Sequence, residues 1–300
     1  MTKPQGGKRE KASRRRFFTD SGIAAIGAAG VLASAAGAAF AQQTAAPSPV
    51  SDFAWGDAMK RIKTAGKLVV AQSGSPVPPQ YYRDPKTNEP AGYDAEIARM
   101  IAKDLDVEPV FEEAIVAARI SGLQAGKYDI VLGGTANTPA RALSVAFTRG
   151  YIPYQQVLLV HADSPIKEAD ELNDPKFTIT AMIGSTAEYA ARQRFPKANI
   201  KPLKLNEAML EVAAGRADAD LVELYLAGPF AKIQPNTKVL GGIDKPIIVA
   251  TEFGCIACRA SEMGFRQWLD NWLYWYDSHG TLGALYDRIM GPALRGESNR

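Results

Sequence analysis

The sequence predicts an α/β protein with largely parallel sheets, because short β-rich runs alternate with helical patterns from Lys67 onward. The alternation occurs in two successive series, over residues 67–132 and 178–222. A length of 300 residues suggests roughly two domains. With 46% hydrophobic and 22% charged residues, the composition argues against disordered and collagen-like classes.

The first series begins with a buried-strand candidate at 68–71. Four apolar side chains then recur at helical spacing: Tyr93, Ile97, Ile101 and Leu105. They predict an amphipathic helix over 94–105. A short strand at 107–111, a short helix that ends at Gly126, and a strand at 128–132 complete this series.

The second series has the same rhythm. It predicts a strand at 178–182, a helix from Thr186, a strand near Ile200, a helix over 207–215 and a strand at 219–222. The end of the chain adds a strand at 254–259 and two helices, at 262–276 and 282–289.

Residues 1–41 predict a cleavable twin-arginine signal peptide. A basic stretch with arginines at 14–16 precedes a weakly apolar Ala/Gly run, which ends in a small-x-small pattern at 39–41. The alternative is a retained membrane anchor. We expect cleavage near Gln42, a disordered leader over 42–54, and export by the twin-arginine translocase.

The net charge of the chain comes from this segment. Seven cationic and two acidic side chains give residues 1–41 a charge of +5, whereas the whole chain carries +3. The remainder therefore carries −2 and offers no basic patch for nucleic acid.

Two cysteines match a C-x-x-C pattern but lie in the strand expected at 254–259. Cys255 and Cys258 should therefore point to opposite faces of the sheet. A redox pair sits at a helix N-terminus that lowers a thiol pKa, and a zinc site requires further ligands. We therefore expect neither redox nor metal chemistry.

A glycine-rich turn follows the strand at 128–132. Thr138 suits the N-cap of a short helix, with Pro139 at its first position and Arg141 in its first turn. A cation there opposes the helix dipole unless an anion lies beside it. Arg141 is therefore a candidate carboxylate clamp, and the alternative is an ion pair with a local acid.

A second turn follows the strand at 178–182. Ser185 and Glu188 form a capping-box pattern, and the first-turn amides of such a helix can bind an anion. The alternative is an ordinary capped helix. Because ligands of open α/β sheets bind at the carboxyl ends of strands, the two turns could enclose a small anionic molecule.

Short motifs occur in a characteristic order over residues 55–291. They lie at 66–70, 90–98, 126–131, 138–141 with 147–148, 184–188, 215–219 and 283–286. In this order and spacing the chain resembles the periplasmic solute-binding proteins of family 3, which serve ABC importers of polar amino acids.

The resemblance implies a periplasmic-binding-protein fold of two α/β lobes joined by two hinge strands, with the ligand in the cleft between them. Lobe 1 would comprise 55–153 and 254–292, and lobe 2 would comprise 154–253. The hinges would fall near 153–154 and 253–254.

The resemblance also implies how the protein works. It would be a periplasmic monomer that captures a small carboxylate-bearing solute and delivers it to a membrane ABC permease. No cofactor, metal ion or catalytic residue is expected.

Family ligand positions carry over residue by residue. Arg141 matches the arginine that grips an α-carboxylate, and Thr186 matches a residue whose backbone amide meets the same group. Gly134 matches a position whose carbonyl oxygen receives the α-ammonium. Thr135 and Ser185, in the same two turns, are further ligand-binding candidates.

Two charged side chains complete the implied site. Glu223 matches the acidic residue that pairs with the α-ammonium, and Asp220 is a rival for that role. Arg119 resembles an arginine that binders of acidic amino acids use for the side-chain carboxylate. Its alternative is a solvated helix face.

The chain departs from the family at three positions. Ala136 stands where a serine or threonine is frequent, and Val77 and Gln80 stand where aromatic rings occur. A ring could come instead from one of three tyrosines: Tyr81, Tyr82 or Tyr151. These changes leave open a carboxylate that is not an amino acid, such as a diacid.

An enzyme is the alternative from another class, because fold does not fix function. Some relatives of this family are periplasmic dehydratases acting on cyclic acids. Glu188 would then be a candidate general acid.

Overall fold

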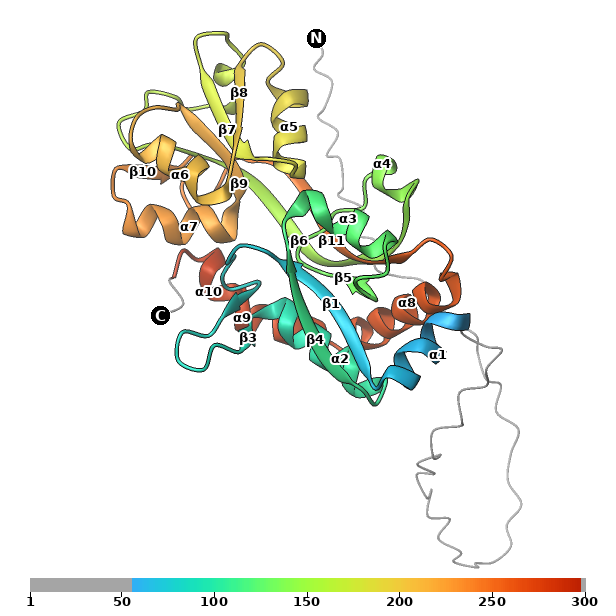
Figure 1. The fold of residues 1–300 in the computed structure, drawn as a ribbon. Helices are drawn as coiled ribbons and strands as arrows, with labels where there is room; N and C mark the ends of the chain where they lie inside the picture. The colour runs from blue at the N-terminus through green and yellow to red at the C-terminus, as the bar shows by residue number, and fades with distance from the viewer. Residues whose placement is uncertain (1–55, 298–300) are drawn as a thin grey trace, which may run out of the picture. The chain divides into compact units, whose positions relative to one another are not determined.

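Nine strands form one hydrogen-bonded sheet among residues 56–297, the part of the chain that the computed structural model describes (Figure 1). Their order is β4, β1, β5, β11, β6, β9, β7 and β8, and β10 pairs with β6. The strands are β1 (Lys67–Ser73), β4 (Glu108–Ala114), β5 (Ile130–Val131), β6 (Val145–His161), β7 (Thr178–Met182), β8 (Asn199–Leu203), β9 (Ala219–Glu223), β10 (Thr237–Val239) and β11 (Ile248–Arg259). A separate pair, β2 (Tyr82–Arg83) and β3 (Pro90–Ala91), follows β1.

The helices alternate with these strands. They are α1 (Gly56–Ala65), α2 (Tyr93–Asp104), α3 (Val116–Gln124), α4 (Pro139–Ala142), α5 (Thr186–Arg194), α6 (Leu205–Ala213), α7 (Leu224–Ile233), α8 (Met263–Ser278), α9 (Thr281–Ile289) and α10 (Gly291–Leu294), with a 3-10 turn at Ala169–Leu172.

The α/β class and the parallel pairing predicted for both series are confirmed. β1 pairs in parallel with β4 and β5, and β7 pairs in parallel with β8 and β9. The expected strand at 178–182 coincides with β7, whereas the one expected at 128–132 is only two residues long. The lengths differ because pairing ends where the backbone turns toward Gly133 and Gly134, both at φ 70°.

The sequence pattern missed two long elements. β6 has 17 residues, but Gly150 and Pro153 interrupt its apolar pattern. α7 carries Gly228 and Pro229 in its interior, where both residues normally disfavour a helix. Tertiary pairing and packing stabilise both segments against their local preferences.

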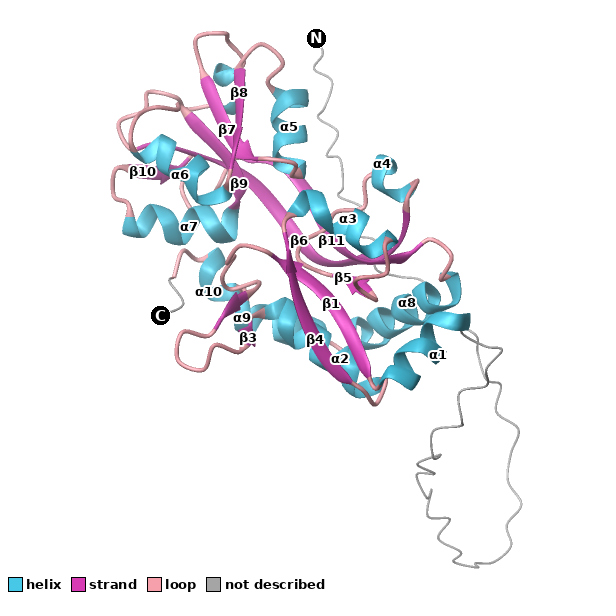
Figure 2. Cartoon of the chain, viewed as in Figure 1, coloured by secondary structure: helices cyan, strands magenta, loops and turns pink. Residues whose placement is uncertain are grey.

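The antiparallel pair of β6 and β11 runs through the middle of the sheet. Figure 2 shows it between one group of strands, β1, β4 and β5, and another, β7, β8 and β9. We call the first group, with helices α1 to α4 and α8 to α10, lobe 1. We call the second group, with helices α5 to α7, lobe 2. Pro153 on β6 is the register partner of Phe253 on β11, at the predicted hinge positions.

Buried side chains pack into clusters within each lobe and between them. Ile97, Ile101 and Leu269 belong to a cluster in lobe 1, and Leu172 and Phe195 belong to one in lobe 2. A further cluster combines side chains from both lobes: Val77, Tyr81, Leu159, Leu205 and Val222. The loop that follows β1 is therefore packed against lobe 2.

The two cysteines lie on opposite faces of β11, as predicted. Cys258 belongs to the cluster around α2 and α8, and Cys255 belongs to a different one with Val145 and Phe147. Both thiols are free and buried. Burial raises the pKa of Cys255 and raises the pKa of Cys258 to about 12, which keeps both thiols protonated near neutral pH.

The predicted signal peptide at 1–41 and leader at 42–54 lie outside the described residues. Within residues 56–297, no helix has the length and apolar character that a bilayer span requires.

Candidate functional site

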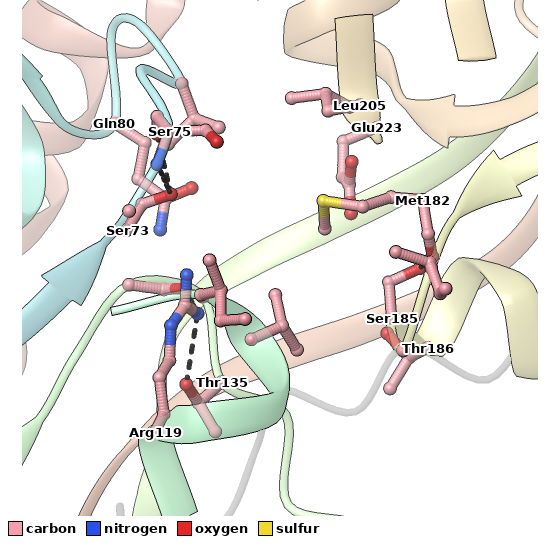
Figure 3. Close-up of a pocket in the computed structure, with 18 of the residues that line it drawn as sticks. Ser73, Ser75, Gln80, Arg119, Thr135, Met182, Ser185, Thr186, Leu205 and Glu223 are labelled. Carbon is pink, nitrogen blue, oxygen red and sulfur yellow. Dashed lines mark hydrogen bonds between the residues drawn. The ribbon is translucent and has the colours of Figure 1, made fainter. Parts of the chain in front are cut away.

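A cavity of about 290 Å³ lies between the two lobes and is lined by residues of both. Figure 3 shows Gln80, Arg119 and Thr135 on one side, and Met182, Thr186 and Glu223 on the other. The lining residues come from segments at the carboxyl ends of β1, β4, β5, β7, β8 and β9, which include the first turns of several of the helices that follow, and from Tyr154 on β6. This is the edge at which ligands of open α/β sheets bind.

Arg141 reaches from lobe 1 to lobe 2 at one end of the cavity. The predicted cap is confirmed, since Thr138 Oγ1 accepts from the Arg141 backbone N–H at 3.3 Å and Pro139 starts α4. The guanidinium donates from Nη1 to Ala136 O (3.0 Å) and from Nη2 to Gly184 O (3.3 Å).

These acceptors of Arg141 are neutral. Among residues 56–297, no carboxylate lies within ion-pair distance of the guanidinium, so the alternative of a local ion pair is wrong for this part of the chain. Burial lowers the pKa of Arg141, and Glu252 partly offsets this effect electrostatically. A half-buried cation whose hydrogen-bond partners are neutral favours binding of an anion.

The turn before α5 forms the opposite wall. Ser185 Oγ accepts from the Glu188 N–H at 3.2 Å, and Glu188 Oε2 accepts from the Gly184 N–H at 2.8 Å. In a capping box the Glu188 carboxylate would accept from the N–H of Ser185 itself. Here it accepts from the N–H of the preceding residue, Gly184. Ser185 and Thr186 line the cavity, while Glu188 lies outside its lining and also accepts from Arg192.

Arg119 is 4% exposed and lines the cavity, so the solvated-face alternative is wrong. Its Nε donates to Ala114 O at 3.2 Å, and its Nη1 donates to Gly133 O and lies 3.5 Å from Thr135 Oγ1. Burial lowers the pKa of Arg119, whereas the charge of Asp94 raises it. Nη2 has no hydrogen-bond acceptor among the described residues.

Asp94 is a buried carboxylate behind the cavity wall that the sequence did not assign to the site. It accepts from Gln80 Nε2 (2.7 Å), the Gly133 N–H (3.0 Å) and Tyr151 Oη (2.7 Å). Burial raises its pKa to about 6 even though these three bonds lower it. An acid beside Tyr93 in the apolar stripe of α2 was the available sequence signal.

Glu223 and Asp220 lie on β9 but have different surroundings. Glu223 lines the cavity, and burial raises its pKa with a further contribution from Glu252. Asp220 lies outside the lining, where Thr180 Oγ1 donates to its Oδ1 at 2.9 Å. Burial raises the pKa of Asp220 to about 8. The geometry therefore favours Glu223 as the residue that meets a ligand.

Tyr81 was a candidate to supply a ring to the ligand, but it does not line the cavity. It is 1% exposed, and its ring centroid lies 6.4 Å from that of Phe111. The loop turns Gln80 toward the cavity instead. The rings that line the described cavity belong to Tyr154 and Tyr225, which sequence reasoning missed because they lie on β6 and α7.

Gly134 and Thr135 both line the cavity. A Cβ on Gly134 would lie 2.9 Å from Tyr154 Oη and 3.1 Å from Gln80 Nε2. The positive φ of this residue and this close approach both require glycine. The structure thus brings together seven of the eight predicted site residues.

Comparisons with known proteins agree with this architecture. The family model of bacterial extracellular solute-binding proteins, family 3, matches residues 68–292. A glutamine-binding protein of an ABC transporter from Bacillus subtilis is 28% identical over 178 residues, which cover 57% of this chain and 65% of that protein. An L-glutamate/L-aspartate-binding protein from Pseudomonas aeruginosa is 24% identical over 244 residues, 77% of this chain and 78% of that protein. The chain spans 65%, 59% and 64% of the first three curated relatives, less than two thirds of each.

Solved structures are similar over more of their length. An ancestral amino acid-binding protein, described as a precursor of cyclohexadienyl dehydratase, has a TM-score of 0.70 and 30% identity, covering 78% of this chain and all of that chain. The solute receptor for L-cysteine of Neisseria gonorrhoeae has a TM-score of 0.69 and 25% identity, covering 78% of this chain and 94% of that chain. The two-lobed fold is thus shared with amino-acid-binding proteins.

Proposed function

Because the chain belongs to family 3 of the bacterial extracellular solute-binding proteins, we propose that it captures an amino acid in the periplasm and delivers it to an ABC permease. The relatives that support this proposal are named as binding proteins for glutamine, arginine, and glutamate with aspartate. Such proteins bind without making or breaking a bond.

The observation that carries the proposal is the pairing of opposite charges in one cavity. Arg141 has neutral partners among the described residues, and Glu223 lines the same space. A zwitterion presents a carboxylate and an ammonium group, and both would find an opposite charge here. The ligand charges would then replace the water that these two half-buried side chains lose.

The binding mode follows from the elements around these two residues. The α-carboxylate would lie between the Arg141 guanidinium and the first-turn amides at Ser185 and Thr186, where the α5 dipole favours an anion. The α-ammonium would lie between Glu223 and the backbone of the turn at Gly134.

We propose further that the amino acid is acidic. Arg119 Nη2 has no described acceptor, and the positive charge of Arg141 lowers the pKa of Arg119, so the two guanidiniums interact. A side-chain carboxylate would accept from Nη2 and reduce this repulsion. A cationic side chain would instead add a third positive charge close to Arg119.

A diacid that is not an amino acid is the second candidate. Ala136 and Gln80 replace the hydroxyl and the ring common in amino-acid binders of the family, and the two arginines could each take one carboxylate. This candidate leaves Glu223 without a partner charge. The dehydratase alternative is weaker, because Glu188 accepts from Gly184 and Arg192 outside the cavity lining.

We also propose the division into lobe 1 (55–153 and 254–292) and lobe 2 (154–253). The register pairing of Pro153 with Phe253 supports two hinges at adjacent positions of the connecting strands. Export by the twin-arginine translocase and a monomeric state complete the proposal.

Titration calorimetry of the mature protein tests the function. L-glutamate, L-aspartate, L-glutamine, L-arginine and succinate are each titrated at fixed pH and salt. We expect the acidic amino acids to bind most tightly and L-arginine to bind least. A ligand at 100 times its Kd should add about 2.7 kcal/mol to the unfolding free energy. Chemical conversion of the ligand would contradict the transport function, and preference for succinate would favour the diacid.

A further inference from the structure

Gln80 is a buried amide whose hydrogen-bonding groups are engaged in both lobes. It is 2% exposed at the edge of the cavity. Its Oε1 accepts from Tyr225 Oη at 2.6 Å, while its Nε2 donates to Asp94 Oδ2 at 2.7 Å and to Tyr154 Oη at 2.8 Å. We call these four residues the Gln80 network.

The direction of these bonds is fixed by the partners. A carboxylate accepts and cannot donate, so Asp94 requires the NH2 side of the amide. The carbonyl side then faces Tyr225, whose hydroxyl must donate to it. The opposite amide orientation would place Oε1 against the Asp94 carboxylate, which is repulsive.

The network joins the two lobes beside the ligand cavity. Gln80 lies in the loop after β1 of lobe 1, and Tyr225 lies in the first turn of α7, two residues after Glu223. The Tyr225–Gln80 bond is therefore a direct contact between the lobes, made through side chains 145 positions apart in the sequence.

The network also extends to the turn that lines the cavity. Asp94 accepts from the Gly133 N–H at 3.0 Å, and Arg119 donates to the Gly133 carbonyl oxygen. Both backbone polar groups of Gly133 are thus held. The next residue is Gly134, where an added Cβ would lie too close to Gln80 and Tyr154.

We infer that Gln80 and Tyr225 are positioning residues that keep the lobes closed over the bound solute and thereby set its residence time. This inference rests on the proposed capture of a solute. Opening of the lobes would break the Tyr225–Gln80 bond and expose both groups to water. Closure therefore exchanges two hydrated groups for one buried bond, and opening must reverse that exchange before the solute can leave.

Tyr225→Phe tests this role because it removes one hydroxyl and keeps the ring. It leaves Gln80 Oε1 buried without its donor in the closed protein. We expect the dissociation rate of the tightest-binding amino acid to rise roughly tenfold, with the association rate changed less than about twofold. Stopped-flow measurement of intrinsic tryptophan fluorescence gives both rates. An unchanged dissociation rate, or an equal change in both rates, would overturn the inference.

Tyr93→Phe is the matched control. Tyr93 is a buried lobe 1 tyrosine whose Oη lies 3.4 Å from Tyr151 O, outside the Gln80 network. We expect it to leave both rates unchanged.

Gln80→Glu is the second variant. It sets a carboxylate against Asp94. Tyr154 and Tyr225 also face the substituted side chain, and Tyr151 and Arg119 act on Asp94. The affinity of this variant should fall at pH 8, where both carboxylates are ionised and repel each other. It should recover toward wild type near pH 5, where the pair of carboxyl groups holds a proton and one can donate to the other. Absence of this recovery would contradict the assigned bond directions.

A readout without ligand separates the inference from the function. Hydrogen exchange at the Gly133 amide should be faster in Gln80→Glu than in wild type at pH 8, because its acceptor Asp94 is displaced. If the wild type binds no amino acid, the proposed function is wrong, and so is the role of Gln80 and Tyr225 in closure over a solute. The exchange measurement still tests whether Gln80 and Asp94 hold the Gly133 amide, because it needs no ligand.

Discussion

Arg141 of lobe 1 donates from Nη2 to the backbone carbonyl oxygen of Gly184 in lobe 2, across 3.3 Å. Gly184 immediately precedes the cap of α5, so this bond places the cation at the positive end of a helix dipole. Such a contact is electrostatically poor unless an anion lies between the two. Four predictions follow from this arrangement and from the buried acids around it.

Arg141→Ala should abolish most of the affinity for amino acids while leaving the protein folded. The carboxylate loses its charged partner, which costs about 2.8 kcal/mol of binding free energy, roughly 100-fold in Kd. Calorimetric titration measures the loss, and thermal unfolding of the unliganded protein reports the fold. Arg216→Ala is the control, because Arg216 pairs with Glu211 on the surface away from the cavity. Retained affinity in Arg141→Ala would show that another group binds the carboxylate.

Arg119→Met should change selectivity as well as affinity. The substitution removes the guanidinium that faces the proposed side-chain carboxylate, while methionine fills much of its volume. We expect the Kd for L-glutamate to rise roughly tenfold more than the Kd for L-glutamine. Arg119 also donates to the Gly133 carbonyl oxygen, so its removal could disturb that turn and weaken both ligands. The ratio of the two Kd changes removes this shared effect. Equal losses for both ligands would mean that Arg119 only positions that turn.

Glu223→Gln separates an amino acid from a diacid. An α-ammonium loses its partner charge, so amino-acid affinity should fall roughly 100-fold. A diacid has no ammonium, and its affinity should stay level or increase when the negative charge is removed. Titration of L-glutamate and succinate against the variant measures both. Glu297→Gln is the control, because Glu297 pairs with Arg295 and neither residue lines the cavity. Undiminished glutamate binding would rule out Glu223 as the ammonium partner.

Asp220 should make the unfolding free energy depend on pH. Burial raises its pKa from 3.8 to about 8, so the folded protein keeps this proton while the unfolded chain has released it. Between about pH 4 and pH 8 the unfolded state therefore binds fewer protons, and stability falls as pH rises through that window. Urea unfolding of wild type and Asp220→Asn at several pH values gives the slopes. The unfolding free energy of the variant should fall less steeply with pH than that of wild type. Identical slopes would contradict the raised pKa of Asp220 in the folded protein.

Much of the fold could be predicted because its signals are local. The apolar spacing along α2, the cap formed by Thr138 and the cap formed by Ser185 each depend on residues within a few positions. These patterns were sufficient for the α/β class, the parallel pairings and the two turns that face the cavity. β6 and α7 were missed because their stability comes from partners elsewhere in the chain.

The sequence by itself determined which turns carry the charged and flexible groups, including Arg141 and the glycines at 133 and 134. Only the tertiary structure decided which side chains meet. No local pattern pairs Asp94 with Gln80 or Gln80 with Tyr225, yet they bond over separations of 14 and 145 residues. The physical reason is desolvation: a buried polar group must find a partner wherever the fold supplies one, and sequence spacing does not encode that meeting.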